Sequence, residues 1–181
     1  LIARYPCNRV LYRMEFIMKK AYFAGGCFWC ITPIFKMYGA YKSLCGYSGG
    51  DEVNPCYEDV KKQKTSHRET IAVEYCSEKV SYENLVDIFL ANVDPFDKDG
   101  QFIDKGHSYT LAIYYTNEEE KLVAERKVSE LQAKTGKQVY IAIEKLKNFY
   151  EAEEYHQDYR RVEEEENKRH EERRKRFFHT A

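Results

Sequence analysis

Apolar residues alternate with polar ones along some segments of the chain and recur every three or four residues along others. A period of two is typical of a strand with one buried face, whereas a period near 3.6 is typical of an amphipathic helix. The first pattern predicts strands within residues 19–24, 40–50, 70–75, 109–116 and 138–146. Glycine-rich turns follow the first two of these strands.

Helical spacing predicts three helices between these strands. The first begins at Cys27, contains a Thr32-Pro33 pair that resembles a cap with a first-turn proline, and stops at Gly39. The second begins at Ser81, and the third covers residues 117–136 and ends at its last glycine. Strands that alternate with helices indicate an α/β or α+β domain with a mixed sheet in its middle. Residues 94–108 form a polar loop in this scheme.

A chain of 181 residues fits one domain. Residues 1–17 show no clear period and are expected to form an N-terminal extension. Residues 18–159 then make up the folded unit. Residues 160–181 are expected to be a charged C-terminal tail, either helical or disordered, because charged side chains dominate there and apolar anchors are few.

Composition narrows the class of protein further. Hydrophobic residues make up 43% and aromatic residues 15% of the chain, which favours a packed core over disorder. The 29 Lys and Arg residues nearly balance the 30 Asp and Glu residues, which argues against nucleic acid or a membrane surface as a partner. No apolar run approaches the roughly 20 residues that span a bilayer, and no signal peptide is recognisable. We therefore expect a cytoplasmic protein.

Six cysteines lie in the first 76 residues, and no export signal is recognisable that would lead us to expect a disulfide framework. Reduced thiols with one or two reactive members therefore fit better. Cys27 is the strongest candidate, because it follows a strand and a Gly-Gly turn at the start of a helix, where the helix dipole lowers the pKa of a thiol. The alternative for Cys27 is a buried, inert thiol.

Phe28 and Trp29 stand between Cys27 and Cys30. Two large rings beside a reactive sulfur would make an apolar wall for a small uncharged group. The Cys-x-x-Cys spacing also fits a dithiol redox pair or half of a zinc site, but no second ligand pair follows, so no metal is expected. A thioredoxin-like dithiol-disulfide oxidoreductase that uses Cys27 and Cys30 is the alternative function.

Several separated motifs together resemble the peptide methionine sulfoxide reductase A family. They occur in the family's order between about Lys19 and Tyr159, and they are GGCFWC with Pro33-Ile34-Phe35, GYSGG (46–50), NPCYEDV (54–60), TSHRETIAVEY (65–75), DPFDKDGQFIDKGHSY (94–109) and FYEAEEYHQDY (149–159). The resemblance implies a two-layer α/β sandwich around a central mixed β-sheet in a single domain. It makes residues 18–159 a methionine sulfoxide reductase catalytic domain that reduces the S-epimer of methionine sulfoxide, free or in proteins.

The resemblance also implies a role for each matching residue. Cys27 is the nucleophile, and Phe28 and Trp29 form the pocket for the substrate methyl group. Glu69 is the acid that protonates the sulfoxide oxygen, while Tyr57 and Tyr109 hydrogen-bond that oxygen and Asp104 helps to position the site. A sulfoxide is a poor electrophile until its oxygen is protonated, so an acid kept neutral by apolar surroundings suits this chemistry.

Attack by Cys27 leaves a sulfenic acid that must be reduced. The resemblance implies no cofactor beyond an external thiol reductant, which is thioredoxin in the cell or dithiothreitol in vitro. Three routes can reduce the sulfenic acid. Cys56 is the preferred resolving cysteine, and Cys30 is the second candidate, because a bridge over three helical residues is strained. Direct attack by an external thiol is the third route. A module that only binds oxidised methionine remains as a non-enzymatic alternative.

Overall fold

The computed structural model describes residues 17–157. The predicted extension, apart from Ile17, and the predicted charged tail lie outside the described residues. The helices and strands are β1 (Met18–Gly25), α1 (Phe28–Met37), β2 (Lys42–Ser48), α2 (Tyr57–Lys61), β3 (Arg68–Cys76), α3 (Tyr82–Leu90), β4 (Gly100–Gln101), β5 (Asp104–Lys105), η1 (His107–Tyr109), β6 (Leu111–Tyr115), α4 (Glu118–Thr135), β7 (Ile141–Lys145), β8 (Tyr150–Glu151) and η2 (Glu154–His156).

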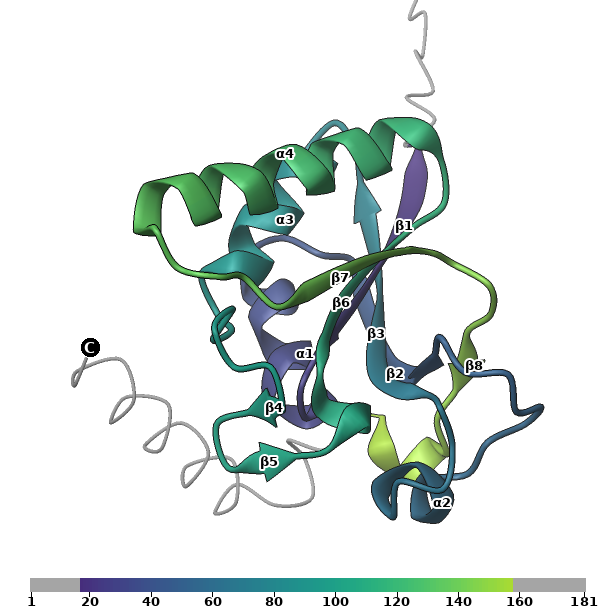
Figure 1. The fold of residues 1–181 in the computed structure, drawn as a ribbon. Coiled ribbons are helices and arrows are strands. Elements are labelled where there is room, and N and C mark those ends of the chain that lie inside the picture. Colours follow the sequence, from purple (N-terminus) through teal and green to yellow (C-terminus); the bar gives the residue numbers. More distant parts are fainter. Residues whose placement is uncertain (1–16, 158–181) are drawn as a thin grey trace, which may run out of the picture.

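A six-stranded sheet with the order β7-β6-β1-β3-β2-β8 organises the domain (Figure 1). Strands β6 and β7 run parallel, and every other neighbouring pair in this sheet is antiparallel. The sheet is therefore mixed, as predicted. The parallel pair is connected through α4, because parallel strands need a crossover.

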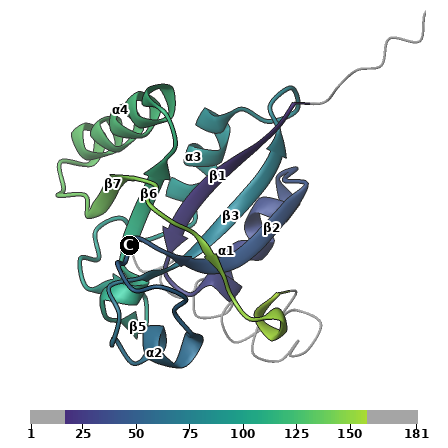
Figure 2. The same ribbon diagram turned by 90° about the vertical axis from the view of Figure 1, so that its right-hand side faces the viewer.

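The helices α1, α3 and α4 cover one face of this sheet (Figure 1). On the other face, the segment that leads from β7 to β8 crosses the strands (Figure 2), where Phe149 packs on Tyr22 with ring centroids 5.5 Å apart. The central strand β3 is buried along almost its whole length, since both of its faces are covered. The predicted two-layer α/β architecture is confirmed.

The predicted ends of two helices agree with the structure. Ser81 caps α3 in a capping box with Asn84, and the side chain of Asn117 accepts a hydrogen bond from the Glu120 N–H at the start of α4. Gly136 ends α4 in the left-handed conformation, with φ +67°.

The prediction for Pro33 is wrong. Helix α1 has already begun at Phe28, so Pro33 lies inside the helix rather than in its first turn. A proline there has no N–H to donate to the preceding turn. The helix nevertheless continues to Met37, because Ile34 and Phe35 are buried in the core and hold the second turn against the sheet.

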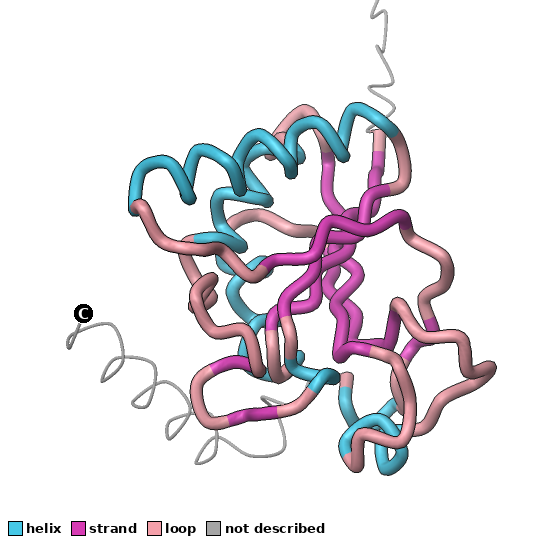
Figure 3. The backbone as a smooth tube through the Cα atoms, viewed as in Figure 1, coloured by secondary structure: helices cyan, strands magenta, loops and turns pink. Residues whose placement is uncertain are grey.

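The polar loop predicted at 94–108 contains local structure that its composition did not reveal. It includes the two-stranded β4–β5 sheet and the turn η1, so Tyr109 ends a 3₁₀ turn instead of starting the predicted strand. The short helix α2 was not predicted either. Loops connect these elements at the end of the main sheet opposite α4 (Figure 3).

The segment after β7 is held on the edge of the sheet by close backbone contact. Gly46 allows this approach, since a Cβ there would lie 2.5 Å from the Tyr150 carbonyl oxygen. The side chain of Gln157 then continues the strand pairing: its Oε1 accepts from the Cys45 N–H, and its Nε2 donates to the Cys45 carbonyl. These contacts place residues 150–157 beside the end of the sheet that carries α2.

Candidate active site

Cys27 lies at the junction of β1 and α1, where it is the N-cap residue of the helix and partly exposed. Gly26 makes the sharp turn before it, with φ +79°. A Cβ at Gly26 would lie 2.6 Å from the Cβ of Gln101, so only glycine permits the 94–109 loop to pack this closely against the turn before Cys27. The turn therefore joins the cysteine to a loop that is distant in sequence.

Glu69 on β3 lies under the start of α1. Its Oε2 accepts a hydrogen bond from the Phe28 N–H over 3.0 Å, and only 2% of the residue is exposed. Burial raises the pKa of Glu69 to about 8, since the Phe28 hydrogen bond only partly offsets the loss of water. The Glu69 carboxyl is therefore mostly protonated at pH 7.

The pKa of Cys27 is raised well above its ordinary value, which contradicts the prediction of a lowered one. The hydrogen bond with the Cys30 thiol is the largest cause, followed by burial and by the negative charges that Cys30, Glu69 and Asp104 can carry. The Cys27 side chain makes no capping hydrogen bond to the helix start, and the first N–H of α1 donates to Glu69 instead.

Tyr57 and Tyr109 approach this group from α2 and from η1. Burial raises the pKa of both phenols, and the charges of Glu69 and Cys27 raise each of them further. Both hydroxyls therefore stay protonated at any ordinary pH and remain hydrogen-bond donors. Asp104 on β5 belongs to the same group, because its charge raises the pKa of Glu69, Cys27 and Tyr109.

An aromatic cluster lies beside the thiol. The Phe28 ring is fully buried, while the Trp29 and Tyr57 rings are partly exposed, with centroids 5.8 Å apart. The centroid of the His156 imidazole lies 4.3 Å from the centroid of the Tyr57 ring and 5.3 Å from that of the Trp29 ring. Burial lowers the pKa of His156, so its ring is neutral at neutral pH and extends the apolar wall.

The two candidate resolving cysteines differ in their surroundings. The Cys30 sulfur is hydrogen-bonded with Cys27, one helical turn away, and the Cys30 N–H donates to the Cys27 carbonyl over 3.0 Å. Cys56 is exposed at the N-cap of α2, where its sulfur donates to Asp59 Oδ2 over 3.4 Å. The structure thus brings Cys30, rather than the preferred Cys56, into direct contact with Cys27.

Two further residues of the site were not assigned from the sequence. Glu153 accepts from the Tyr57 N–H through Oε1, over 2.9 Å, and from the Tyr47 hydroxyl through Oε2, over 2.8 Å. The C-terminal segment therefore fixes the start of α2 and with it Tyr57. The motifs GYSGG and FYEAEEYHQDY contain both Glu153 and Tyr47, and that is the signal that could have found them.

Gln63 fixes the other tyrosine in a comparable way. Its Nε2 donates to Ser108 Oγ over 2.6 Å, and its Oε1 accepts from the Ser108 N–H over 3.0 Å. Gln63 has φ +58°, which costs about 1 kcal/mol in a residue that is not glycine. These hydrogen bonds tie the end of α2 to the residue before Tyr109.

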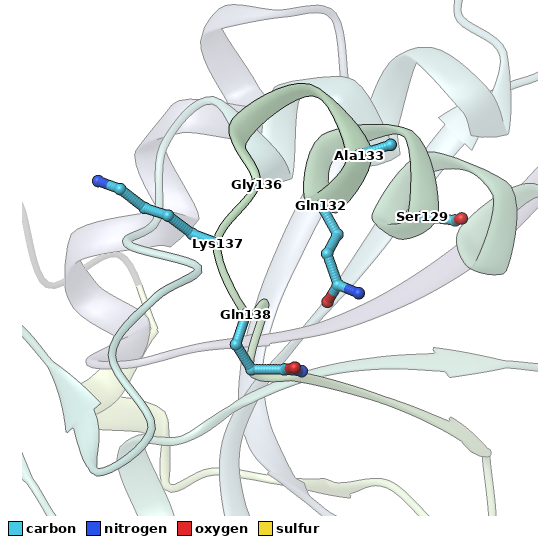
Figure 4. A pocket seen from close by; sticks show the side chains of 6 residues that line it. All are labelled: Ser129, Gln132, Ala133, Gly136, Lys137 and Gln138. Atoms are coloured by element: carbon cyan, nitrogen blue, oxygen red, sulfur yellow. The ribbon is translucent and has the colours of Figure 1, made fainter.

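The surface pocket in Figure 4 is not part of this group. It has a volume of about 370 Å³, and none of the predicted site residues lines it. The residues that line it lie at the end of α4 and just after it: Ser129, Gln132, Ala133, Gly136, Lys137 and Gln138. Among residues 17–157, no three His, Cys, Asp or Glu side chains are grouped as a metal site requires. No helix in the same range is both long and apolar enough to cross a membrane.

Comparison with known proteins gives a consistent result. The sequence model of the family described as peptide methionine sulfoxide reductase matches residues 19–180. Peptide methionine sulfoxide reductase MsrA of Listeria monocytogenes (strain CLIP80459) is 42% identical over 149 residues, which cover 81% of this chain and 84% of that protein.

Two crystal structures of one yeast protein are also similar. Mxr1 from Saccharomyces cerevisiae in reduced form superposes with a TM-score of 0.77 at 28% identity, covering 82% of this chain and 87% of that one. Mxr1 in complex with Trx2 matches with a TM-score of 0.53 at 21% identity, covering 76% of this chain and 82% of that one. The second match supports the fold alone.

A mixed sheet with a cysteine at the start of α1 and a buried carboxyl group below it fits a thiol-dependent α/β oxidoreductase. The chain belongs to the peptide methionine sulfoxide reductase family. The family resemblance drawn from the motifs is thereby confirmed.

The raised pKa of Cys27 leads to a direct prediction. Replacing Cys30 with alanine removes the largest cause of the shift, so the pKa of Cys27 should fall in Cys30→Ala. The pH dependence of iodoacetamide alkylation at Cys27, followed by peptide mass mapping, measures this pKa. Cys56→Ala is the control and should leave it unchanged; an equal midpoint in the wild type and Cys30→Ala would count against the Cys27–Cys30 hydrogen bond.

Proposed function

We propose that this protein reduces methionine-S-sulfoxide, free or in proteins, to methionine, and that Cys27 is the nucleophile. The activity follows from membership of the family, and the assignment of individual residues is our proposal. The observation that carries it is the buried Glu69, protonated at neutral pH and placed under the first N–H of the helix that begins beside Cys27. That arrangement supplies a proton donor and a sulfur nucleophile at one site.

Proton transfer explains why a raised pKa of Cys27 is compatible with the reaction. Two negative charges at Cys27 and Glu69 would repel each other in a buried site, so each group holds one proton before substrate binds. Glu69 gives its proton to the sulfoxide oxygen while the Cys27 sulfur takes that oxygen. The Cys27 proton then restores Glu69, and the products are methionine and a sulfenic acid on Cys27.

The surrounding residues complete the proposal. Tyr57 and Tyr109 donate hydrogen bonds to the sulfoxide oxygen as negative charge develops on it. Asp104 helps to hold Glu69 protonated through its negative charge, which is consistent with a positioning role. Phe28 and Trp29 contribute the apolar wall against which the substrate methyl group packs.

For regeneration we propose Cys30 as the resolving thiol. It condenses with the sulfenic acid, forming a Cys27–Cys30 disulfide and releasing water. The contact between the two sulfurs supports Cys30 over Cys56, which is hydrogen-bonded to Asp59 instead. The first turn of α1 must loosen for the disulfide to form, because an ideal helical turn keeps such residues in a strained geometry.

An external dithiol then reduces the disulfide, and no further cofactor is needed. Thioredoxin is the proposed cellular reductant, and dithiothreitol replaces it in vitro. The yeast protein Mxr1, which is seen in complex with Trx2, is consistent with this choice. A cytoplasmic location is part of the proposal and agrees with the free thiols of the five cysteines in residues 17–157. The thioredoxin-like alternative is not favoured, because the relatives are methionine sulfoxide reductases.

The role of Glu69 predicts a specific kinetic result. In the wild type, kcat/KM should fall as pH rises through about 8, because Glu69 loses the proton that it donates. Glu69→Gln should reduce kcat/KM at pH 7 by about 10²- to 10⁴-fold and abolish this dependence on pH. Turnover of methionine-S-sulfoxide with dithiothreitol measures both effects.

Glu74→Gln is the matched control for this variant. Glu74 lies on the same strand and pairs with Lys20 over 3.1 Å, away from the thiol. The Glu74→Gln variant should keep the wild-type kcat/KM and its dependence on pH. A Glu69→Gln enzyme with near-normal kcat/KM would contradict the assigned role.

The recycling scheme predicts which disulfide forms after one turnover without reductant. Mass mapping should find a Cys27–Cys30 bridge in the wild type and in Cys56→Ser. In Cys30→Ser the sulfenic acid on Cys27 should persist and react with dimedone. A Cys27–Cys56 bridge in the wild type would instead assign the resolving role to Cys56.

A further inference from the structure

The lysines of the α2 region differ in their partners. Lys62 pairs with Glu58 over 2.9 Å, one helical turn back, and Lys64 pairs with Asp59 over 3.5 Å. Among residues 17–157, no carboxylate lies within ion-pair distance of the Lys61 ammonium. Lys61 therefore carries a positive charge that no acidic side chain of the described chain neutralises by direct contact.

The position of Lys61 on α2 directs this charge to the active site. Tyr57 and Lys61 are four residues apart, so they share one face of the helix. The Lys61 Nζ lies 5.4 Å from the centroid of the Tyr57 ring, which belongs to the aromatic cluster beside Cys27. The Lys61 charge also lowers the pKa of Glu69, so its field reaches the proposed proton donor.

A substrate carboxylate close to the sulfoxide would meet this charge. Glu69 does not compete with the substrate for the Lys61 ammonium at neutral pH, because the Glu69 carboxyl group is protonated. The Lys61 side chain is exposed, so a substrate can reach it. An exposed lysine acts as a flexible point charge, which suits a carboxylate that varies in position between substrates.

We propose that Lys61 binds a carboxylate of the substrate and thereby favours methionine sulfoxide that carries a negative charge nearby. This inference rests on the proposed function. The carboxylate has two possible sources: the α-carboxylate of free or C-terminal methionine sulfoxide, or an Asp or Glu side chain next to an internal methionine sulfoxide. Both sources offer the same chemistry to the ammonium group.

Matched substrate pairs test the proposal. The first pair is the S-epimer of N-acetyl-methionine sulfoxide and its carboxamide, which differ only in the α-carboxylate. The second pair is a blocked peptide with Glu after methionine sulfoxide and the same peptide with Gln. For the wild type, kcat/KM should be about two- to fivefold higher for the charged member of at least one pair, the range expected of one exposed ion pair.

Variants at neighbouring lysines show whether Lys61 is responsible. The preference should vanish in Lys61→Gln and survive in Lys61→Arg, which keeps the charge. Lys62→Gln is the matched control, because Lys62 already pairs with Glu58. This variant should prefer the charged substrates as strongly as the wild type does. About 1 M salt should also abolish the preference, since screening then acts over roughly 3 Å.

A binding measurement separates this proposal from the proposed function. The fluorescence of Trp29, the single tryptophan, reports binding of N-acetyl-methionine and its carboxamide without turnover. Tighter binding of the carboxylate that is lost in Lys61→Gln supports the proposal, even if no sulfoxide is reduced. Equal binding and equal kcat/KM within both pairs, or a preference that survives in Lys61→Gln, would overturn it while leaving sulfoxide reduction intact.

Discussion

The Glu69 carboxyl group lies beneath the first turn of α1, accepts the Phe28 N–H and is almost entirely removed from water. Burial disfavours its ionised form, and the charges of Asp104 and Cys30 disfavour it further. The same surroundings keep the proton on Cys27. The site therefore stores one proton on the acid and one on the nucleophile, and the proposed reaction uses both without drawing a proton from solvent.

The fold supplies this arrangement through contacts between segments that are far apart in the chain. The paired strands β1 and β3 set the positions of Cys27 and Glu69, while the 94–109 loop packs on Gly26 and carries Tyr109. The C-terminal segment holds Tyr57 through Glu153 and places His156 against the aromatic cluster. The cluster thus depends on packing contributed by three separate parts of the chain.

The strands and helices with clear periodicity were predictable from the sequence, because apolar spacing directly reflects which face is buried. The motifs also identified the residues that meet around Cys27. The position of Pro33 was not predictable, since burial of Ile34 and Phe35 outweighs its local preference. Nor was the direction of the Cys27 pKa shift, because the sequence does not show the hydrogen bond with Cys30 and the burial that raise this pKa.

The sequence also does not show which of the two candidate resolving cysteines contacts Cys27. Sequence reasoning preferred Cys56 because a bridge across one helical turn is strained, whereas the side-chain contact that favours Cys30 exists only in three dimensions. Lys61 was overlooked for a similar reason. Its neighbours Lys62 and Lys64 look equivalent in the sequence, and only their ion pairs distinguish them.

Carboxyl ¹³C NMR measures the protonation state of Glu69 at neutral pH, on which the proposed reaction depends. The Glu69 resonance is assigned by its absence from Glu69→Gln, and its chemical shift is then followed between pH 4 and pH 10. We predict a titration midpoint near pH 8, because burial raises the pKa of Glu69. A midpoint near 4.5 or below, as for an exposed glutamate, would contradict it.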